Sequence, residues 1–431
     1  MPSNAKLLPY SVFLATLALA GCNIEPRNQS PVTADRTLST GNTPGGSAGL
    51  SCSLSDQKAA LVKIMTPVAA AQSASSTDGL YYLTPNIVDP APYATLSDLL
   101  NAMKSPQDRW SFIEQGGSSG NNSGLQGTSN YQSRFGFRWS ESGGQIRINY
   151  IFANSPAANA SLQRGATITT VNGQAVTSAS QFATALNSAS VTLGLSGGTS
   201  VALSRANFTS PDISDVNVYT LANGSRAGYF YLDNFNNLIE SEYSSAFAQF
   251  KAQNVQSLII DLRYNGGGLI ISSYQLAHMI VGNSKQGLAF NSFKFNGQHS
   301  SKNETLNFNL NQFSSALQNS ALSVNKVVFL TTASSASASE LLIKGLEPHI
   351  DVAVVGSNSN GKPYGMQGVK ICDNTVWPLS FLNENSNLQT TPATGIPPTC
   401  PVTDDLNNPL GNTNEAMLNK AISYLNTNSC A

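Results

Sequence analysis

Between residues 216 and 356 the chain repeats one order: a short apolar run, a turn of small residues, then a helical stretch. Apolar runs of four to eight residues bounded by glycine are typical of buried strands, whereas longer amphipathic stretches are typical of helices. The pattern predicts strands at 228–232, 257–262, 327–330 and 352–356, and helices at 240–252, 269–281 and 338–346. This order indicates a sheet with helices packed on it.

Two regions of different character precede this αβ core. Residues 53–125 contain apolar residues at helical spacing and predict a helical N-terminal domain. Residues 130–206 contain short apolar runs separated by glycine, including an Asn172-Gly173 turn after a strand, and predict a small β-rich domain. The predicted fold class is therefore a multidomain α+β and α/β chain with an αβ core over 216–431, as the length of 431 residues allows.

The first 22 residues have the features of an export signal. Lys6 precedes an apolar stretch over 7–20, which is too short for a membrane helix. The sequence Leu-Ala-Gly-Cys at 19–22 resembles a bacterial lipobox, which implies cleavage before Cys22 and lipidation of its thiol. An ordinary signal peptide that contains a cysteine is the alternative. We expect residues 23–52, rich in Ser, Thr, Asn and Gly, to be a flexible tether to the membrane lipid, with the outer membrane preferred over the inner.

Four cysteines remain after Cys22, and an even number in an exported chain predicts two disulfides. Three pairings are open, and we expect Cys372–Cys400 and Cys52–Cys430, which would close one long loop and join the two ends. The cysteine spacings match no zinc site, so the sequence predicts no metal and no cofactor. A net charge of −1 with 11% charged residues excludes a basic face for nucleic acid.

Three short segments of the αβ core contain candidate catalytic groups. The serine-rich stretch 333–340 begins a helix, where free backbone N–H groups can stabilise an oxyanion, although serines at such places are also ordinary N-caps. Lys362 follows a buried strand; a lysine can be a general base only where burial lowers its pKa, and most loop lysines are solvated. Three glycines at 266–268 allow close backbone approach to a ligand but lack the order of a nucleotide-binding loop.

Together these segments resemble the S41 peptidases, the carboxyl-terminal processing proteases. The glycine turn reads "DLRYNGGG", the nucleophile motif "SASASE" and the lysine motif "GK", in family order and after "DRWSFI". The resemblance implies Ser337 as nucleophile, Lys362 as base, and an oxyanion hole from the amide of Ala338 with one from Gly267 or Gly268. Ser335 and Ser339 would then be packing or capping residues, with Ser339 the second choice of nucleophile.

The lysine loop departs from the family pattern at one position. Many members carry a glutamine four residues after the lysine, where this chain has Met366 and places Gln367 one residue later. Gln367 could orient the amine, another group could do so, or the site could be a plain Ser–Lys dyad; we favour the last two. A histidine base is not indicated, since His278, His299 and His349 lie in unremarkable surroundings.

The β-rich region resembles a PDZ domain. The tripeptide Phe135-Gly136-Phe137 stands at the carboxylate-binding loop, and "SPAANASLQRGATITTVNGQAV" matches the most recognisable stretch of such domains. A PDZ groove adds a peptide as an extra strand, whereas a β-rich domain without a ligand is the alternative. The expected function is a serine endopeptidase of the cell envelope acting on protein C-termini or unfolded segments. A catalytically inactive peptide-binding lipoprotein of the same fold is the second hypothesis.

Overall fold

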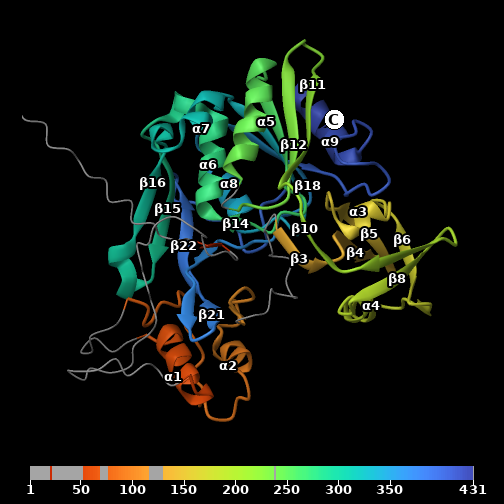
Figure 1. The fold of residues 1–431 in the computed structure, drawn as a ribbon. Coiled ribbons are helices and arrows are strands. Elements are labelled where there is room, and N and C mark those ends of the chain that lie inside the picture. Colours follow the sequence, from red (N-terminus) through yellow and green to blue (C-terminus); the bar gives the residue numbers. More distant parts are fainter. Residues whose placement is uncertain (1–19, 22–51, 68–75, 116–129, 237–238, 431) are drawn as a thin grey trace, which may run out of the picture.

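The computed structural model describes residues 20–21, 52–67, 76–115, 130–236 and 239–430 (Figure 1). The predicted lipidation site Cys22 and nearly all of the predicted signal segment and tether lie outside these residues. Ala20–Gly21, the short strand β1, pair antiparallel with β14 (Gly268–Leu269). Among the described residues no helix combines the length and apolarity required to cross a membrane.

A mixed six-stranded sheet forms the centre of the molecule. Strands β12, β13, β17, β18 and β23 run parallel, and β11 pairs antiparallel with β12 at one edge. Every residue of β13 is buried, as expected for a strand covered on both faces. The strands are, in spatial order, β11 (Ile213–Thr220), β12 (Arg226–Leu232), β13 (Ser257–Asp261), β17 (Lys326–Thr331), β18 (Asp351–Gly356) and β23 (Cys400–Pro401).

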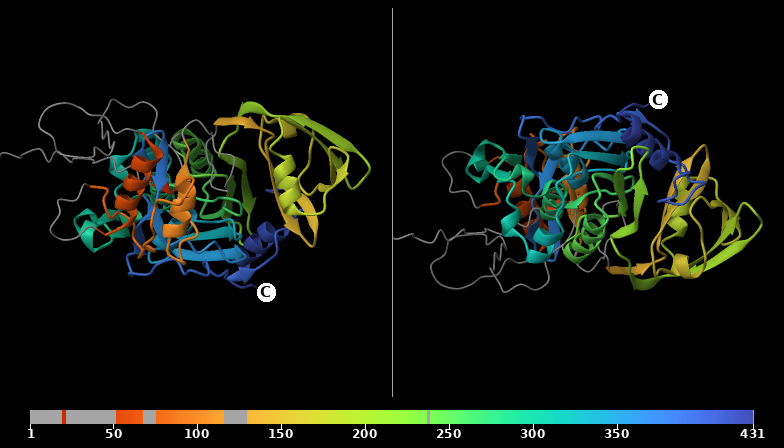
Figure 2. Two further views of the ribbon diagram at one scale, coloured as in Figure 1. Left: turned by 90° about the horizontal axis from the view of Figure 1, so that it is seen from below. Right: turned by 90° about the horizontal axis from the view of Figure 1, so that it is seen from above.

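Helices cover both faces of this sheet, as the sequence order predicts (Figures 1 and 2). Alternate strand residues face opposite sides: Leu258 and Ile260 share a hydrophobic cluster with α5, α6 and α8, whereas Ile259 shares one with α9. The carboxyl ends of the parallel strands therefore meet at one edge between two helical layers, where ligands bind in open αβ sheets. The helices are α5 (Glu240–Ala252), α6 (Ile270–Val281), α7 (Ser315–Ser320), α8 (Ala338–Leu346) and α9 (Ala416–Thr427).

The N-terminal segment packs into the same core. Its two helices, α1 (Leu54–Met65) and α2 (Leu96–Met103), belong to the main hydrophobic cluster, and β2 (Phe112–Glu114) pairs with β21 (Asn374–Trp377).

The core also contains a second, four-stranded sheet, whose strands lie in the order β16, β15, β22, β19. The remaining core elements are β15 (Ala289–Phe295), β16 (Glu304–Asn307), β19 (Tyr364–Met366), β20 (Val369–Ile371), β22 (Leu379–Asn385) and the 3₁₀ turns Gly282–Lys285, Gly297–Lys302 and Leu310–Gln312.

Residues 130–209 form a unit with its own sheet and its own hydrophobic cluster, at one end of the molecule in Figure 2. The sheet is antiparallel with β4 at its edge, and the buried Phe182 packs beneath it. Its elements are β3 (Asn130–Arg134), β4 (Phe137–Ser142), β5 (Gln145–Ile151), α3 (Pro156–Asn159), β6 (Thr167–Val171), β7 (Gln174–Ala175), α4 (Ala179–Ala185), β8 (Ser190–Leu195), β9 (Ser200–Ser204) and β10 (Ala206–Thr209), which pairs with β3.

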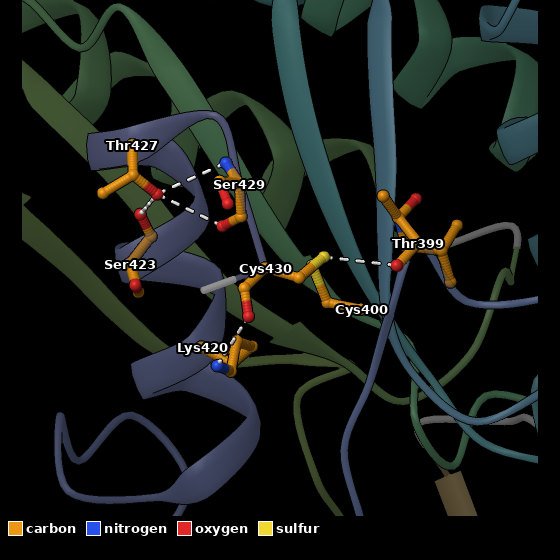
Figure 3. The surroundings of a disulfide bond; sticks show 8 residues. Thr399, Cys400, Lys420, Ser423, Thr427, Ser429 and Cys430 are labelled. Atoms are coloured by element: carbon orange, nitrogen blue, oxygen red, sulfur yellow. Dashed lines mark hydrogen bonds between the residues drawn. A yellow bond between two sulfur atoms is a disulfide. The ribbon is translucent and has the colours of Figure 1, made fainter.

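The disulfide pairing differs from the expected one. Cys52 bonds Cys372 and Cys400 bonds Cys430, so the predicted pairs Cys372–Cys400 and Cys52–Cys430 are wrong. Cys400 starts β23 beside β18, and α9 packs on these strands, which brings Cys430 to Cys400 (Figure 3). Cys372 lies in the turn between β20 and β21, where α1 packs, so its nearest partner is Cys52.

Candidate functional site

Ser337 lies where β17 has ended and α8 begins. Its backbone has φ +57° and ψ −113°, a conformation that residues with a side chain rarely adopt. Its N–H donates to Glu340 Oε2 at 2.9 Å, in the first turn of the same helix. Strained backbone of this kind persists only where the surroundings hold it, and it concentrates at functional sites.

The two neighbouring serines have structural hydrogen bonds. Ser335 Oγ donates to the carbonyl of Leu262 at 2.7 Å, and Ser339 Oγ donates to the carbonyl of Asn265 at 3.0 Å. Both bonds fasten the serine-rich loop to the turn that follows β13. These bonds give Ser335 and Ser339 structural roles in the loop.

The glycine turn lies directly against Ser337. A Cβ on Gly267 would approach Ser337 Cβ to 2.8 Å and the amide nitrogen of Ala338 to 3.1 Å, so a side chain cannot be placed there. Gly267 and Gly268 also have φ values of +109° and +130°, which favour glycine. The N–H of Gly267 donates to Asn265 Oδ1 at 2.8 Å and is therefore committed within the turn.

Lys362 lies in the loop after β18 and is 1% exposed. Its Nζ is 3.3 Å from the sulfur of Met366, the residue that stands where the family's glutamine is expected. Gln367 uses its N–H to bond Ser380 Oγ at 2.9 Å, while its Oε1 is buried and accepts no hydrogen bond within the described part of the chain. Met366 thus offers the amine a weak sulfur acceptor.

Glu340 joins the two loops through one buried carboxylate. Its Oε2 accepts the N–H of Ser337 and that of Lys362, each at 2.9 Å. Its Oε1 accepts the N–H of Gly361 at 2.6 Å and the hydroxyl of Ser359 at 2.5 Å. Burial raises the pKa of Glu340, and these four hydrogen bonds act in the opposite direction. Glu340 was not among the residues expected at the site, although its spacing from Ser337 matches a capping box.

A buried arginine holds the base of the glycine turn. Arg263 is fully buried and pairs with Asp261 at 2.8 Å, Asp404 at 2.7 Å and Glu415 at 2.9 Å. Burial alone would lower the pKa of Arg263, but the surrounding carboxylates raise it well above its usual range. The pKa of Asp404 is lowered although burial opposes this, because Arg263 and Arg164 lie beside it. Two of these partners, Asp404 and Glu415, are distant from Arg263 in sequence, so the cluster was not predicted.

The loop Phe135-Gly136-Phe137 leads into the edge strand β4. Gly136 has φ +87°, and a Cβ there would lie 2.0 Å from Ser155 Cβ. Its carbonyl accepts hydrogen bonds from Ser155 Oγ at 3.1 Å and from the N–H of Phe152 at 3.0 Å. The helix α4 lies beside β4, because the rings of Trp139 and Phe182 meet at 5.0 Å. An edge strand next to a helix is the arrangement that accepts an added peptide strand.

The three histidines bond backbone groups away from the serine. His278 bonds the carbonyl of Tyr274 and the N–H of Asn309, and burial lowers its pKa to about 4. His299 and His349 bond the carbonyls of Asp78 and Ala289. In the described ranges no three His, Cys, Asp or Glu side chains gather as a metal site would require.

The αβ core is similar to known proteins in sequence, and the chain is similar to them in fold. Residues 226–401 match the sequence profile of peptidase family S41. No curated protein matches the chain. A Bacteroides fragilis chain assigned to the S41 proteases has a TM-score of 0.68 at 21% identity, covering 81% of this chain and 96% of its own length, and so shares its fold. A photosystem II D1 C-terminal processing protease has a TM-score of 0.45 at 21% identity, covering 71% of this chain and 80% of its own.

Proposed function

Because residues 226–401 form a peptidase family S41 domain, we propose that this chain is a serine endopeptidase with Ser337 as nucleophile and Lys362 as general base. One observation carries the proposal: a single oxygen of Glu340 accepts the backbone N–H groups of both residues. The nucleophile and the base are therefore fixed to the same buried atom, although 25 residues separate them in sequence (362 − 337).

The reaction follows from these positions. Ser337 Oγ attacks the carbonyl carbon of a peptide bond and gives its proton to Lys362 Nζ, which acts as the general base. The tetrahedral intermediate collapses, the C–N bond breaks, and the leaving amine takes the proton back from Lys362. Water then attacks the resulting ester, passes a proton through Lys362 to Ser337 Oγ, and releases the new carboxylic acid.

An oxyanion hole would form where α8 begins. The N–H of Ala338 is at the first helical position, where the helix leaves backbone donors unsatisfied and its dipole favours negative charge. Since the N–H of Gly267 already donates to Asn265, we assign the second donor to Gly268. Both donors are backbone groups on anchored turns, which is how enzymes stabilise a developing oxyanion.

Substrate recognition is assigned to the unit of residues 130–209. The edge of β4 beside α4 supports pairing with an extended peptide, and the loop at Gly136 would receive a terminal carboxylate. The pairing of Ala20–Gly21 with β14 supports a second point of strand addition, next to Ser337. Protein C-termini or unfolded segments fit both edges.

The membrane assignment is a separate part of the proposal. We assign Cys22 as the lipid attachment site of an envelope protein, on the basis of the lipobox alone. A Cys22→Ser variant should leave the membrane fraction while retaining its catalytic rate in solution. Retention of that variant in the membrane fraction would contradict the lipid anchor.

The decisive experiment compares the purified protein with its Ser337→Ala variant on unfolded casein. We expect cleavage by the wild type and a loss of at least about 10³-fold in the variant, as for removal of a serine nucleophile. Equal cleavage by both proteins would overturn the assignment of Ser337. Binding of casein without cleavage by either protein would favour the second hypothesis, a peptide-binding protein whose Lys362 amine meets a sulfur atom instead of an amide oxygen.

A further inference from the structure

Asn360, two residues before Lys362, connects three separate segments of the chain. Its N–H donates to the carbonyl of Ser335 at 2.8 Å, and its Nδ2 donates to the carbonyl of Ala333 at 3.1 Å. Its Oδ1 accepts the indole N–H of Trp110 at 3.0 Å, and its carbonyl accepts a hydrogen bond from Arg109. All four polar groups of this residue therefore form hydrogen bonds. Two of these bonds are with the serine-rich loop 333–340, and two are with the N-terminal segment.

Trp110 also contacts the lysine loop on the other side of Lys362. Its ring lies 6.0 Å from that of Tyr364, and Tyr82 from the same N-terminal segment lies 5.5 Å from Tyr364. The residues two before and two after Lys362 are thus both in contact with the N-terminal segment. The backbone around Lys362 is fixed at both ends by the same tryptophan.

The position of Trp110 is itself well determined. Asp108 Oδ1 accepts the N–H groups of Trp110 and Ser111, both at 2.9 Å, and Asp108 Oδ2 accepts the hydroxyl of Tyr81 at 2.9 Å. The guanidinium of Arg109 lies 4.8 Å from the centre of the Trp110 ring. The indole N–H therefore points to Asn360 from a rigid turn.

From this geometry we propose that Trp110 and Asn360 are positioning residues for catalysis, which hold the lysine loop against the serine loop. The inference rests on the proposed Ser337–Lys362 chemistry and adds that the N-terminal segment completes the site. Proton transfer between a serine and an amine requires hydrogen-bond distance, and a misplacement of about 1 Å can lower a rate by about 100-fold. Glu340 holds the two loops together through its buried carboxylate, and Trp110 holds the lysine loop through its hydrogen bond to Asn360.

A role confined to folding can be separated from this one. The N-terminal segment is attached to the core independently by the Cys52–Cys372 disulfide and by the pairing of β2 with β21. Replacing Trp110 by phenylalanine removes the N–H donor and keeps an aromatic ring against Tyr364. Such a change should leave the fold intact and loosen only the lysine loop.

The test uses the full chain with three substitutions: Trp110→Phe, Asn360→Ala and, as control, Asn358→Ala. Asn358 lies in the same loop and is exposed, and its side chain donates to the carbonyl of Thr394. The kcat and KM on a peptide substrate, the pH dependence of kcat and the thermal unfolding midpoint are measured for each variant. Ser337→Ala is measured in parallel.

We expect kcat to fall about 100-fold in Asn360→Ala and about fivefold to tenfold in Trp110→Phe, with KM within about twofold of wild type. The pH at which kcat is half-maximal should shift in both variants, and Asn358→Ala should behave as wild type. Unchanged kcat and pH profile in both variants, with Ser337→Ala inactive, would overturn this inference and leave the proposed function standing. A loss of kcat only in proportion to lost folded protein, in both variants, would also overturn it. An active Ser337→Ala would instead overturn the proposed function.

Discussion

The central sheet and the sheet of residues 130–209 differ in how deeply their strands are buried. β13 in the central sheet is buried along its whole length, and the turn after it is fixed by Asn265, Arg263 and the serine loop. β4 in the other sheet is an edge strand with half-buried and exposed residues. The proposed catalytic serine thus lies where many contacts fix the backbone, and the proposed peptide-binding strand lies at the open edge of a sheet.

The two regions meet through arginines of the β-rich unit. Arg138, next to the Phe135–Phe137 loop, pairs with Asp233 at 3.0 Å, and Arg164 pairs with Asp404 at 2.8 Å. Asp404 also pairs with Arg263, which lies in the glycine turn. The β-rich unit is therefore docked on the same buried cluster that supports the turn against Ser337.

Among the variants that compare the two regions, Glu340→Gln in the rigid region should have the largest effect. In Glu340→Gln only one oxygen remains to accept hydrogen bonds, so buried donors around Ser337 and Lys362 lose their partner. We expect kcat to fall roughly 100-fold, which is about 3 kcal/mol in the transition state. The matched control is Glu347→Gln, which removes a carboxylate from the end of the same helix, where it pairs with Lys344. A wild-type kcat in Glu340→Gln would contradict the joint anchoring of the two loops.

The same carboxylate predicts a pH dependence. Because burial raises the pKa of Glu340, it takes up a proton at a pH where an exposed glutamate is still ionised. The protonated carboxyl accepts fewer hydrogen bonds, so activity should fall as the pH falls, in the same direction as protonation of an amine base. A rate maximum at acidic pH would argue against both groups.

A smaller, different effect is expected at Gly136, in the open region. Gly136→Ala places a Cβ against Ser155 and should distort the carboxylate-binding loop, raising KM roughly tenfold while kcat stays within about twofold. The control is Gly143→Ala in the β4–β5 turn, which has a positive φ but nothing within 4 Å of the new Cβ. A fall in kcat with unchanged KM would show that the β-rich unit acts on the chemistry and not on binding.

The smallest effect is expected at Met366. Met366→Leu keeps the buried volume and removes the sulfur that lies 3.3 Å from Lys362 Nζ. We expect kcat to fall by less than about fivefold, because a thioether is a weak acceptor. A loss greater than about 50-fold would mean that the sulfur is the main group orienting the amine.

Local patterns in the sequence were sufficient for much of the fold. The strands at 257–262 and 327–330 were predicted from continuous apolar runs, and the helix at 240–252 from apolar residues on one side. The small sheet of β15, β16, β19 and β22 was missed, since its strands are polar on one side and far apart in sequence. Periodicity identifies an element, but it does not identify the element's partners.

The same distinction applies to the site. Ser337 was chosen by its motif, and its role as nucleophile stays a prediction. The disulfides were mispaired because cysteine spacing contains no information on how α1 and α9 pack. Glu340 was overlooked because its role appears only when the lysine loop folds back onto α8.

The most direct test of the central claim is to label the protein with a serine-reactive fluorophosphonate and to locate the label by peptide mass mapping. The serine oxygen displaces fluoride from phosphorus, so the label reports which hydroxyl is activated. We predict one label, on Ser337, and labelling at least about 100-fold slower in Lys362→Ala. A label on Ser335 or Ser339, or an unchanged labelling rate in Lys362→Ala, would contradict the Ser337–Lys362 assignment.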